Sequence, residues 1–283
     1  MMQFSYYPGC SLHSTGVEYG ESVRAVFEHL QVQLKELEDW NCCGASSAHS
    51  LNKDLALALP ARNLAIAQEA GLDVVMPCAA CYSRHKATDH ALRTGNGQRQ
   101  RIEEIAGFTF LGTVGVRPLL DVVCSDIGLK SVEAAVVRRL NNLPLVAYYG
   151  CLLVRPPEIA RFDDPENPRL MGELLQALGA DVRPWSYATE CCGGGLSITT
   201  PDVAGRLVRR LGERAAEAGA DAIVTSCPLC QVNLEMRQAG RKLPVFYFTE
   251  LMGLAFGLPE ARRWWSKHLI DPKTLLRQAG LFA

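Results

Sequence analysis

The apolar positions of this chain form short continuous runs separated by longer segments of helical period. Short apolar runs are typical of buried strands, which we predict at Phe4–Tyr7, Asp73–Met76, Leu145–Tyr149 and Ala222–Thr225. Between them the pattern predicts helices at Val17–Leu37, Leu51–Ala70, Pro168–Leu178 and Asp202–Ala218. Strand, helix, helix and strand, joined by connections of crossover length, favour a parallel α/β arrangement.

This order of elements occurs twice along the chain. Gly71 and Gly219 follow the second helix of each copy, where a helix commonly ends. The stretch "NNLP" near residue 143 is the predicted boundary between the copies. We therefore predict two α/β domains, residues 1–143 and residues 144–283, with their sites at strand ends, where α/β sheets place them.

Composition narrows the class of protein. With 283 residues, 48% apolar and 21% charged, the chain resembles a soluble globular protein. A net charge of −1 gives no reason to expect a nucleic-acid partner. The sequence lacks an apolar run of about 20 residues and a secretory signal. We therefore expect a cytoplasmic protein that does not itself span a membrane.

Eleven cysteines are unusual for a reducing compartment, where clustered cysteines more often bind metal or do redox chemistry. Apart from Cys124, they form two sets, C-x31-CC-x34-C-x2-C and C-x39-CC-x34-C-x2-C. The flanking sequence repeats as well: "YYPGC" corresponds to "AYYGC", and "AGLDVVMPCAAC" to "AGADAIVTSCPLC". Matching blocks in one order indicate internal duplication.

Five cysteines in each set exceed the needs of common metal sites. A structural zinc ion typically takes four ligands, and an ordinary cubane iron–sulfur cluster also takes four. Five thiolates suit a site in which one sulfur bridges irons or the cluster is opened out. Glycines after the paired cysteines, Gly44 and Gly193 to Gly195, let the backbone approach and aim N–H groups at sulfur.

The two blocks resemble the cysteine-rich CCG domains in the B subunit of heterodisulfide reductase, which carries two such domains in tandem. The resemblance spans nearly the whole chain. It includes "GCLLVRP" at Gly150–Pro156, "ECCGGG" at Glu190–Gly195, "CPLCQVNLE" at Cys227–Glu235 and "WWSKHLIDP" at Trp264–Pro272. The implied fold is two tandem CCG domains, each a small, mainly parallel sheet flanked by helices, related by pseudo-twofold symmetry.

The resemblance also implies two noncubane [4Fe–4S] clusters that face each other and cleave a disulfide between them. The ligands of the first cluster would be Cys10, Cys42, Cys43, Cys78 and Cys81. Those of the second cluster would be Cys151, Cys191, Cys192, Cys227 and Cys230. No member of either set is missing from the sequence.

By this resemblance the chain is the catalytic subunit of a heterodisulfide reductase-type complex. The resemblance implies an oxidoreductase that reduces or forms a disulfide between two thiol coenzymes, whose identity the sequence does not give. No G-x-G-x-x-G follows a predicted strand, so electrons must come from partners. These would be a ferredoxin-type [4Fe–4S] subunit and a flavin and iron–sulfur subunit, like the family's C and A subunits.

Alternatives remain open at this point. The chain could be a non-catalytic electron-transfer subunit of a quinone- or dehydrogenase-linked complex, and zinc could fill one or both sites. His13 and His49 lie close enough in sequence to Cys10 and Cys43 to serve as proton sources, or they are merely exposed.

Further residues have less specific interpretations. We expect Cys124 to be a small core residue, and His29, His85 and His90 to lie on helix surfaces. Residues 264–268 either dock on their own domain or line the mouth of a site, and the longer loop Arg155–Pro168 either rims the site or is a surface insertion.

Overall fold

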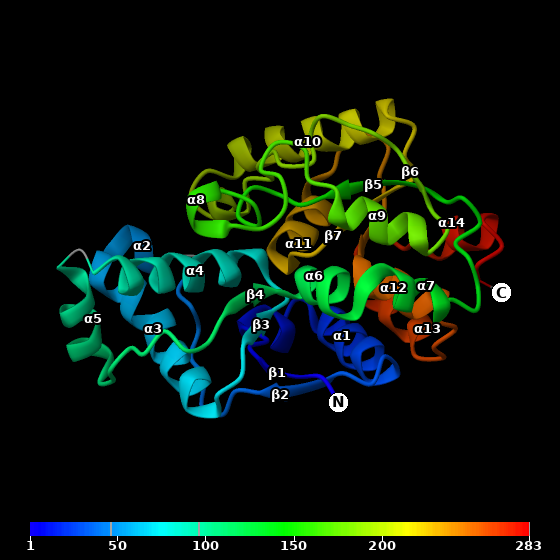
Figure 1. Ribbon diagram of the computed structural model, residues 1–283. Helices are drawn as coiled ribbons and strands as arrows, with labels where there is room; N and C mark the ends of the chain where they lie inside the picture. The colour runs from blue at the N-terminus through cyan, green and yellow to red at the C-terminus, as the bar shows by residue number, and fades with distance from the viewer. Residues whose placement is uncertain (46, 96, 283) are drawn as a thin grey trace.

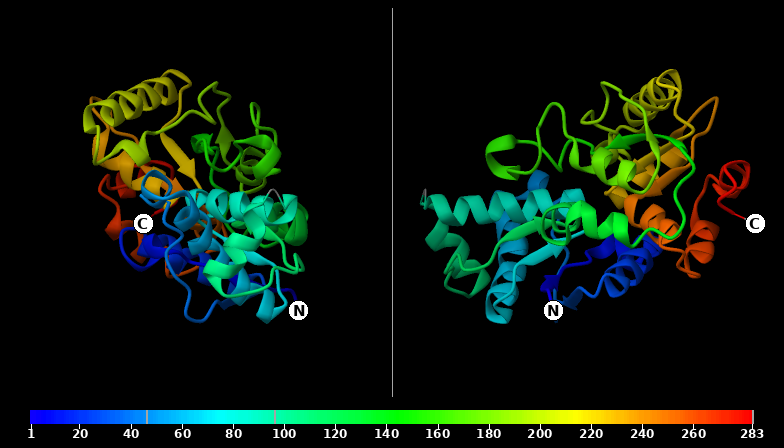
Figure 2. Two further views of the ribbon diagram at one scale, coloured as in Figure 1. Left: turned by 90° about the vertical axis from the view of Figure 1, so that its left-hand side faces the viewer. Right: turned by 45° about the vertical axis from the view of Figure 1, so that its right-hand side comes forward.

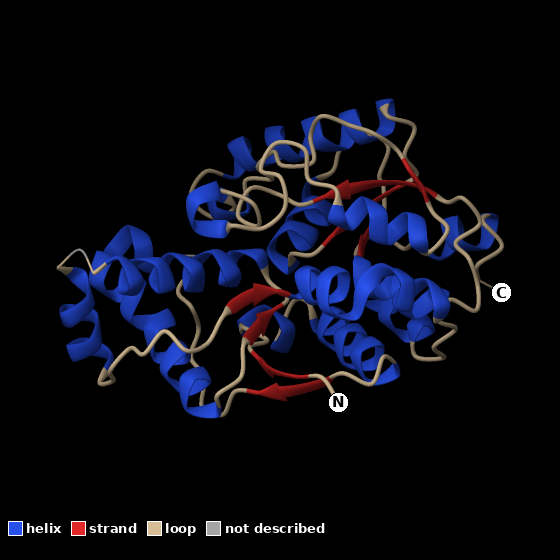
Figure 3. Cartoon of the chain, viewed as in Figure 1, coloured by secondary structure: helices blue, strands red, loops and turns tan. Residues whose placement is uncertain are grey.

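Two four-stranded sheets, one in each half of the chain, form the framework of this computed structural model, which describes residues 1–45, 47–95 and 97–282. The strand orders are β2-β1-β3-β4 and β6-β5-β7-β8, and every neighbouring pair is parallel. Figure 3 shows the two sheets as separate groups of strands with helices around each. The predicted α/β class, with two duplicated units, is confirmed.

The first half contains the four strands of one sheet and the helices between and after them. In chain order these elements are β1 Gln3–Tyr6, α1 Val17–His29, β2 Gln33–Glu36, α2 Ala48–Leu51, α3 Lys53–Ala70, β3 Val74–Met76, α4 Ala79–Thr94, α5 Gln98–Ala106, β4 Val116–Pro118, α6 Leu119–Asp121 and α7 Leu129–Ala134. A short 3-10 helix, η1, covers Cys10–His13, and a π-helical stretch, η2, covers Val122–Gly128.

The second half repeats this order: β5 Pro144–Tyr148, α8 Pro157–Ala160, α9 Leu170–Ala177, β6 Asp181–Val182, α10 Pro201–Glu217, β7 Ala222–Thr225, α11 Pro228–Arg237, β8 Val245–Tyr247, α12 Phe248–Ala255, α13 Ala261–Trp264 and α14 Lys273–Gln278. The 3-10 helices η3 and η4 cover Gly194–Leu196 and Trp265–Lys267. Among the residues described, no helix is long and apolar enough to cross a membrane.

One of the predicted helices is too long, and two strands were missed. The helix predicted at Val17–Leu37 ends at His29, and the chain continues as the edge strand β2. Gln31 adopts a left-handed φ of 57°, which a helix cannot continue through. In the second half Gly179, with φ 89°, likewise separates α9 from β6. Both edge strands are short and partly polar, so their pairing with β1 and β5 leaves no apolar signal in the sequence.

The two halves pack against each other through helices that make contact across their boundary. Helix α1 of the first half packs against α12 of the second, and α9 of the second packs against α7 of the first. Both views of Figure 2 place α1, in blue, beside the orange segment that contains α12. Ser22 on α1 and Thr249 on α12 share a buried hydrogen bond of 2.6 Å. Apolar contacts therefore continue across the boundary between the halves in one core.

Residues close to the predicted domain boundary also bond to the second half. The amide of Val137 donates to the Ala255 carbonyl at 3.0 Å, and that of Leu140 donates to Leu178 at 2.9 Å. Strand β5 begins at Pro144, so the segment before it is an ordered part of the interface. The division into residues 1–143 and 144–283 stays a prediction.

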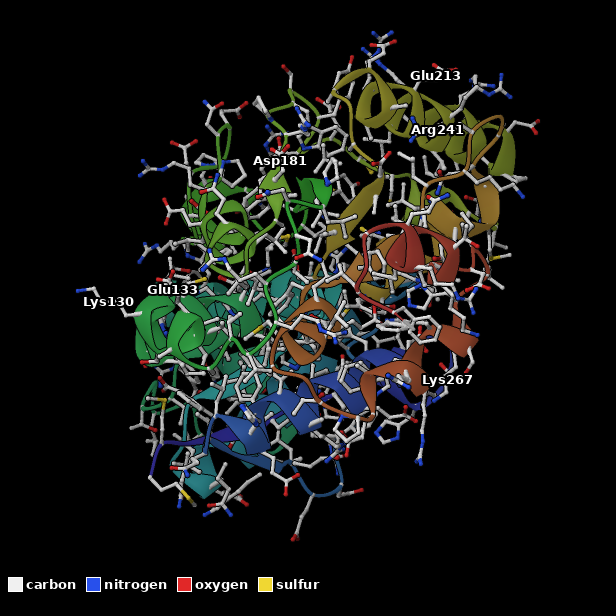
Figure 4. The ribbon with its side chains drawn as sticks, turned by 90° about the vertical axis from the view of Figure 1, so that its right-hand side faces the viewer. Lys130, Glu133, Asp181, Glu213, Arg241 and Lys267 are labelled. Atoms are coloured by element: carbon white, nitrogen blue, oxygen red, sulfur yellow. The ribbon has the colours of Figure 1, made fainter. Side chains whose placement is uncertain are left out.

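The C-terminal segment docks on both halves. Trp264 and Trp265 are buried, and Lys267 forms an ion pair of 2.5 Å with Glu21 on α1 (Figure 4). These contacts favour the expectation that residues 264–268 pack on the protein's own surface. They also connect the end of the chain to the first helix.

A buried ionic triad fixes this segment from inside. His268 Nδ1 lies 3.0 Å from Glu235 Oε1, and its Nε2 lies 2.9 Å from Glu250 Oε1. All three side chains are buried. Burial alone lowers the pKa of His268, but the two carboxylates outweigh it and raise the pKa to about 11. Glu235 belongs to α11, so the triad links the tail to the helix that begins after Cys227 and contains Cys230.

We expect His268→Gln to lower the free energy of unfolding by about 3–5 kcal/mol, because it leaves two buried carboxylates without their cation. A histidine whose pKa is raised in the folded state contributes fully below its unfolded pKa of about 6.5. That contribution is lost as the pH rises through about 11. Urea unfolding of the wild type and the variant at pH 6 and pH 9 tests this.

The difference between the two proteins should be smaller at pH 9 than at pH 6. His29→Gln, a change at an exposed histidine, is the matched control and should show no such dependence on pH. An equal loss at both pH values for His268→Gln would contradict an ionic role for this histidine.

Candidate functional site

Each C-x2-C motif joins the end of a buried strand to the start of a helix. Cys78 follows β3 and is the N-cap residue of α4, and Cys227 stands in the same place between β7 and α11. Cys81 and Cys230 lie in the first turns of these helices. Free N–H groups and the positive end of the helix dipole favour thiolates there.

The first cysteine of each set lies at the end of the neighbouring strand. Cys10 opens η1 after β1, and Cys151 follows β5. The glycine before each has positive φ. A Cβ on Gly9 would lie 2.9 Å from Cys81 Sγ, and one on Gly150 would lie 3.3 Å from Cys230 Sγ. The missing side chain therefore lets the strand end approach the sulfur of the C-x2-C motif.

Tyrosines hold the two CC loops in equivalent positions. Tyr7 Oη donates to the carbonyl of Asn41 at 2.9 Å, and Tyr148 Oη donates to that of Glu190 at 2.8 Å. Asn41 and Glu190 are the residues immediately before the paired cysteines. Each strand β1 or β5 therefore positions both its own cysteine and the CC pair that follows much later in the chain.

The glycine after each CC pair is required by the backbone. Gly44 and Gly193 have φ of 71° and 76°, and their amides donate to Cys42 Sγ at 3.5 Å and to Cys191 Sγ at 3.2 Å. A Cβ on Gly44 would lie 2.6 Å from the Cβ of Ala48. The expected N–H contacts to sulfur are present, and close packing on the next helix explains why the residue is glycine.

The cysteine sulfurs of each set approach one another in pairs. Cys43 Sγ lies 3.4 Å from Cys81 Sγ, and Cys192 Sγ lies 3.5 Å from Cys230 Sγ. Cys42 Sγ lies 3.8 Å from Cys10 Sγ. Within the described ranges, no three His, Cys, Asp or Glu side chains converge as a single metal ion would require. All eleven cysteines are free thiols.

Close contact makes the thiols share protons. Hydrogen bonds from Cys42 and Cys81 lower the pKa of the Cys43 thiol to about 2. The hydrogen bond that Cys42 donates to Cys43 is the main cause that raises the pKa of Cys42. In the second set, a hydrogen bond from Cys151 lowers the pKa of Cys191 to about 6. The low pKa values favour the thiolate form of Cys43 and Cys191, which is the form that binds metals.

The two sets meet at the first cysteines of their C-x2-C motifs. Cys227 accepts hydrogen bonds from Cys230 and from Cys78, and these hold its pKa well below the usual value. The hydrogen bond to Cys227 is the main cause that raises the pKa of Cys78. The amide of Ala80, in the first turn of α4, also lowers the pKa of Cys227. The start of α4 therefore lies near the start of α11 across the two halves.

Burial divides each set into an inner and an outer part. The inner sulfurs are buried and belong to Cys43, Cys78, Cys81, Cys192, Cys227 and Cys230. Cys10, Cys42 and Cys191 are exposed, and Cys151 is half-buried. Solvent and small molecules can therefore reach the outer thiols, while the inner ones face the interface between the halves.

The two candidate histidines are exposed, and neither has a described contact with sulfur. His13 Nε2 lies 3.4 Å from Glu36 Oε1, and its ring packs on Trp40. His49 lies on α2, where slight burial and the charge of Arg84 lower its pKa. Their role as proton sources stays a prediction.

His85 was expected on a helix surface, and that expectation is wrong, because the residue is fully buried. Its Nδ1 lies 2.8 Å from the Cys81 carbonyl, and its Nε2 lies 3.2 Å from Asn63 Nδ2. Asn63 in turn makes two hydrogen bonds, of 3.0 and 2.9 Å, with the backbone of Asn41. His85 stands one helical turn after Cys81, so the shared helix face was the available signal.

Cys124 and the longer loop of the second half both lie in contacts between the halves. Cys124 is half-buried, with Sγ 3.6 Å from the Leu170 carbonyl, in the contact between η2 and α9. The longer loop of the second half contains α8, which packs on α4 of the first half. Tyr82 of α4 donates to the Ala160 carbonyl of α8. This insertion therefore adds to the interface between the halves.

Comparison with known families matches this architecture. The cysteine-rich domain named CCG matches the chain twice, at residues 4–84 and 145–235. The chain belongs to the CCG family. Each match begins in the first strand of a half and ends in the helix after the C-x2-C motif, so the two CCG domains each contain all five cysteines of one set.

Relatives cover almost the whole chain. An "8-methylmenaquinol:fumarate reductase membrane anchor subunit" of Wolinella succinogenes is 30% identical over 96% of this chain and 99% of its own length. A protein of Archaeoglobus profundus, named as similar to the B subunit of heterodisulfide reductase, is 28% identical, with 91% of each chain covered. The B subunit of a CoB–CoM heterodisulfide reductase from Methanosarcina acetivorans is 25% identical over 91% of this chain and 90% of its own. The resemblance to the B subunit of heterodisulfide reductase is confirmed.

A solved structure shares the fold alone. The crystal structure of a hypothetical protein from Helicobacter pylori superposes with a TM-score of 0.72 at 10% sequence identity. The match covers 94% of this chain and 51% of that one.

We expect Gly44→Ala to lower the free energy of unfolding by more than about 1 kcal/mol, because alanine is strained at positive φ and its Cβ would overlap Ala48. Gly195→Ala in the second CCG motif is the control, since no atom lies within 4 Å of the added Cβ. Urea unfolding measures both variants. Equal midpoints would show that the packing of Gly44 on α2 does not constrain the loop.

Proposed function

We propose that this protein is the catalytic subunit of a heterodisulfide reductase-type complex, which reduces or forms a disulfide between two small thiol compounds. The observation that carries the proposal is that two complete five-cysteine sets occur in one chain, with their C-x2-C motifs close together: the residues before Cys78 and Cys227 both lie 3.2 Å from the Tyr19 hydroxyl. The relatives named as B subunits of heterodisulfide reductases support it, and their names indicate an oxidoreductase family.

The donor chemistry of each set fits an iron–sulfur cluster. The five cysteines of each set lie in segments that follow the strands of one sheet, and the amides of Gly44 and Gly193 donate to cysteine sulfur. We propose that Cys10, Cys42, Cys43, Cys78 and Cys81 hold one noncubane [4Fe–4S] cluster, and that Cys151, Cys191, Cys192, Cys227 and Cys230 hold another. When bound, such clusters supply electrons one at a time. Zinc in one or both sites is the alternative that metal analysis decides.

The protein's own residues would set access and shape around these groups. Exposed Cys10, Cys42 and Cys191 mark the side from which a disulfide approaches. Tyr7 and Tyr148 hold the residue before each CC pair in place. Because the inner sulfurs are buried, water and competing thiols reach only the outer part of each set. His13 and His49 are near enough in sequence to deliver protons there, although their described side-chain partners lie elsewhere.

Electrons would reach this chain from other subunits. The relatives are named as subunits, or as similar to one, which supports membership of a multi-subunit complex. We propose a ferredoxin-type [4Fe–4S] partner and a flavin and iron–sulfur partner. The free state of all eleven cysteines supports action in a reducing compartment such as the cytoplasm.

A second candidate function is electron transfer without disulfide chemistry. The relative that is 30% identical is named as a subunit of an 8-methylmenaquinol:fumarate reductase. In that role the two sites would relay electrons between a quinone-linked or dehydrogenase partner and another redox centre. The direct contact between the inner cysteines suits a relay as well as a shared active site.

We expect anaerobically purified protein to contain about eight irons per chain. Cys81→Ser, which removes a buried ligand of one set, should reduce this to about four. Cys124→Ser is the control and should keep the full content, since Cys124 lies outside both sets. Metal analysis with visible absorption checks the result. Zinc in place of iron, or unchanged iron in Cys81→Ser, would contradict the proposed ligand sets.

Disulfide chemistry separates the two candidate functions. The iron-loaded chain is reduced with an artificial electron donor and given the CoB–CoM heterodisulfide or glutathione disulfide. A catalytic subunit should release thiol in proportion to the electrons consumed, and a relay subunit should take up electrons without releasing thiol. Thiol titration measures the product, and the same chain without metal provides the background.

A further inference from the structure

Tyr19 lies between the two C-x2-C motifs. It belongs to α1 of the first half and is fully buried. Its hydroxyl oxygen lies 3.2 Å from the carbonyl of Pro77 and 3.2 Å from that of Ser226. Pro77 and Ser226 are the residues immediately before Cys78 and Cys227. One hydroxyl therefore lies between the same backbone carbonyl of both halves and shares its single proton between them.

The ring of Tyr19 is held by the second half. It stacks on Tyr247 with a centroid separation of 4.0 Å and an interplanar angle of 2°. Tyr247 ends β8, and its own hydroxyl lies 3.4 Å from Gln231 Oε1. The nearby hydrogen bond of 2.6 Å between Ser22 and Thr249 joins α1 to α12, the helix that follows β8. Rotation or withdrawal of the Tyr19 ring would therefore disturb several buried contacts.

Only the first half supplies a hydroxyl that bridges the two C-x2-C motifs in this way. The sequence "YGE" at residues 19–21 in α1 corresponds to "MGE" at residues 171–173 in α9. The position equivalent to Tyr19 is therefore Met171, which is also buried but has no hydroxyl. A tandem duplication has thus become asymmetric at the point where its two copies meet.

Geometry links this bridge to the contact between the sulfurs. Each carbonyl is separated from the following cysteine by a single peptide bond, so fixing both carbonyls on one oxygen limits how far the two cysteines can separate. Cys78 and Cys227 lie near enough to shift each other's pKa, that of Cys78 upward and that of Cys227 downward. These two cysteines directly follow Pro77 and Ser226, whose carbonyls lie beside the Tyr19 hydroxyl.

We propose that Tyr19 is a positioning residue that keeps Cys78 and Cys227 in contact and thereby sets the coupling between the two metal sites. The coupling of metal sites rests on the proposed function. The contact between the cysteines does not, and it can be measured without metal. Tyr19→Phe removes the hydroxyl and keeps the stacked ring. Tyr247→Phe is the matched control, because it removes a hydroxyl from the partner ring that does not touch either carbonyl.

The first measurement is spectroscopic and uses the iron-loaded chain. Electron paramagnetic resonance of the fully reduced wild type should show each site's signal broadened by the other. With iron content unchanged, Tyr19→Phe should weaken this interaction and Tyr247→Phe should preserve it. A general loss of packing would affect both variants alike. An unchanged interaction in Tyr19→Phe would overturn the proposal.

The second measurement uses the metal-free chain with Cys81→Ser and Cys230→Ser, so that Cys78 and Cys227 lack their motif partners. Diamide oxidises the two thiols to one disulfide, and its N=N bond takes up both electrons and both protons to become a hydrazine. Mass spectrometry follows the linked peptide. Adding Tyr19→Phe should slow its formation about fivefold, the equivalent of one hydrogen bond, and Tyr247→Phe should not.

The two measurements separate the two proposals. If the wild type binds no iron and the rate of disulfide formation still depends on Tyr19, the proposed function fails and the positioning role stands. If iron binds and neither the resonance signals nor the rate of disulfide formation responds to Tyr19→Phe, the positioning role fails and the cluster sites stand.

Discussion

The contact between the starts of α4 and α11 is the constraint around which the molecule is built. Both helices have a cysteine as N-cap residue, first-turn N–H groups lower the pKa of each of these cysteines, and Cys78 and Cys227 lie near each other there. Two helix N-termini carry like partial charges, so bringing them together needs negative charge between them. A thiolate at Cys227, whose pKa is held well below its usual value, would provide that charge.

Helix packing between the halves supports this arrangement. Helix α1 of the first half packs on α12 of the second, and α9 of the second half packs on α7 of the first. In Figure 1, α6, α7 and α12 lie between the two sheets, close to α1 and α9. The buried triad of His268, Glu235 and Glu250 ties the tail to α11 from the far side. The geometry of the inner cysteines therefore depends on residues far from them in sequence.

The two CCG domains share a plan but differ in how they fix their cysteines. In the first domain, His85 and Asn63 connect the C-x2-C helix to the CC loop. In the second, Asn233 donates directly to the Cys192 carbonyl at 2.6 Å. Tyr19 has no equivalent hydroxyl in the second domain. Such differences give each site its own surroundings, as two chemically distinct thiol fragments would require.

The sequence by itself determined the duplication, the α/β class and the grouping of ten cysteines into two sets of five, because apolar runs and cysteine spacing are local patterns. It also indicated Gly44 and Gly193, whose positions after the CC pairs repeat. Only the tertiary structure decided that β2 and β6 are edge strands, since short polar strands are specified by their neighbours. It also placed His85 inside and Tyr19 between the halves, because burial and bridging depend on segments that meet only in the folded chain.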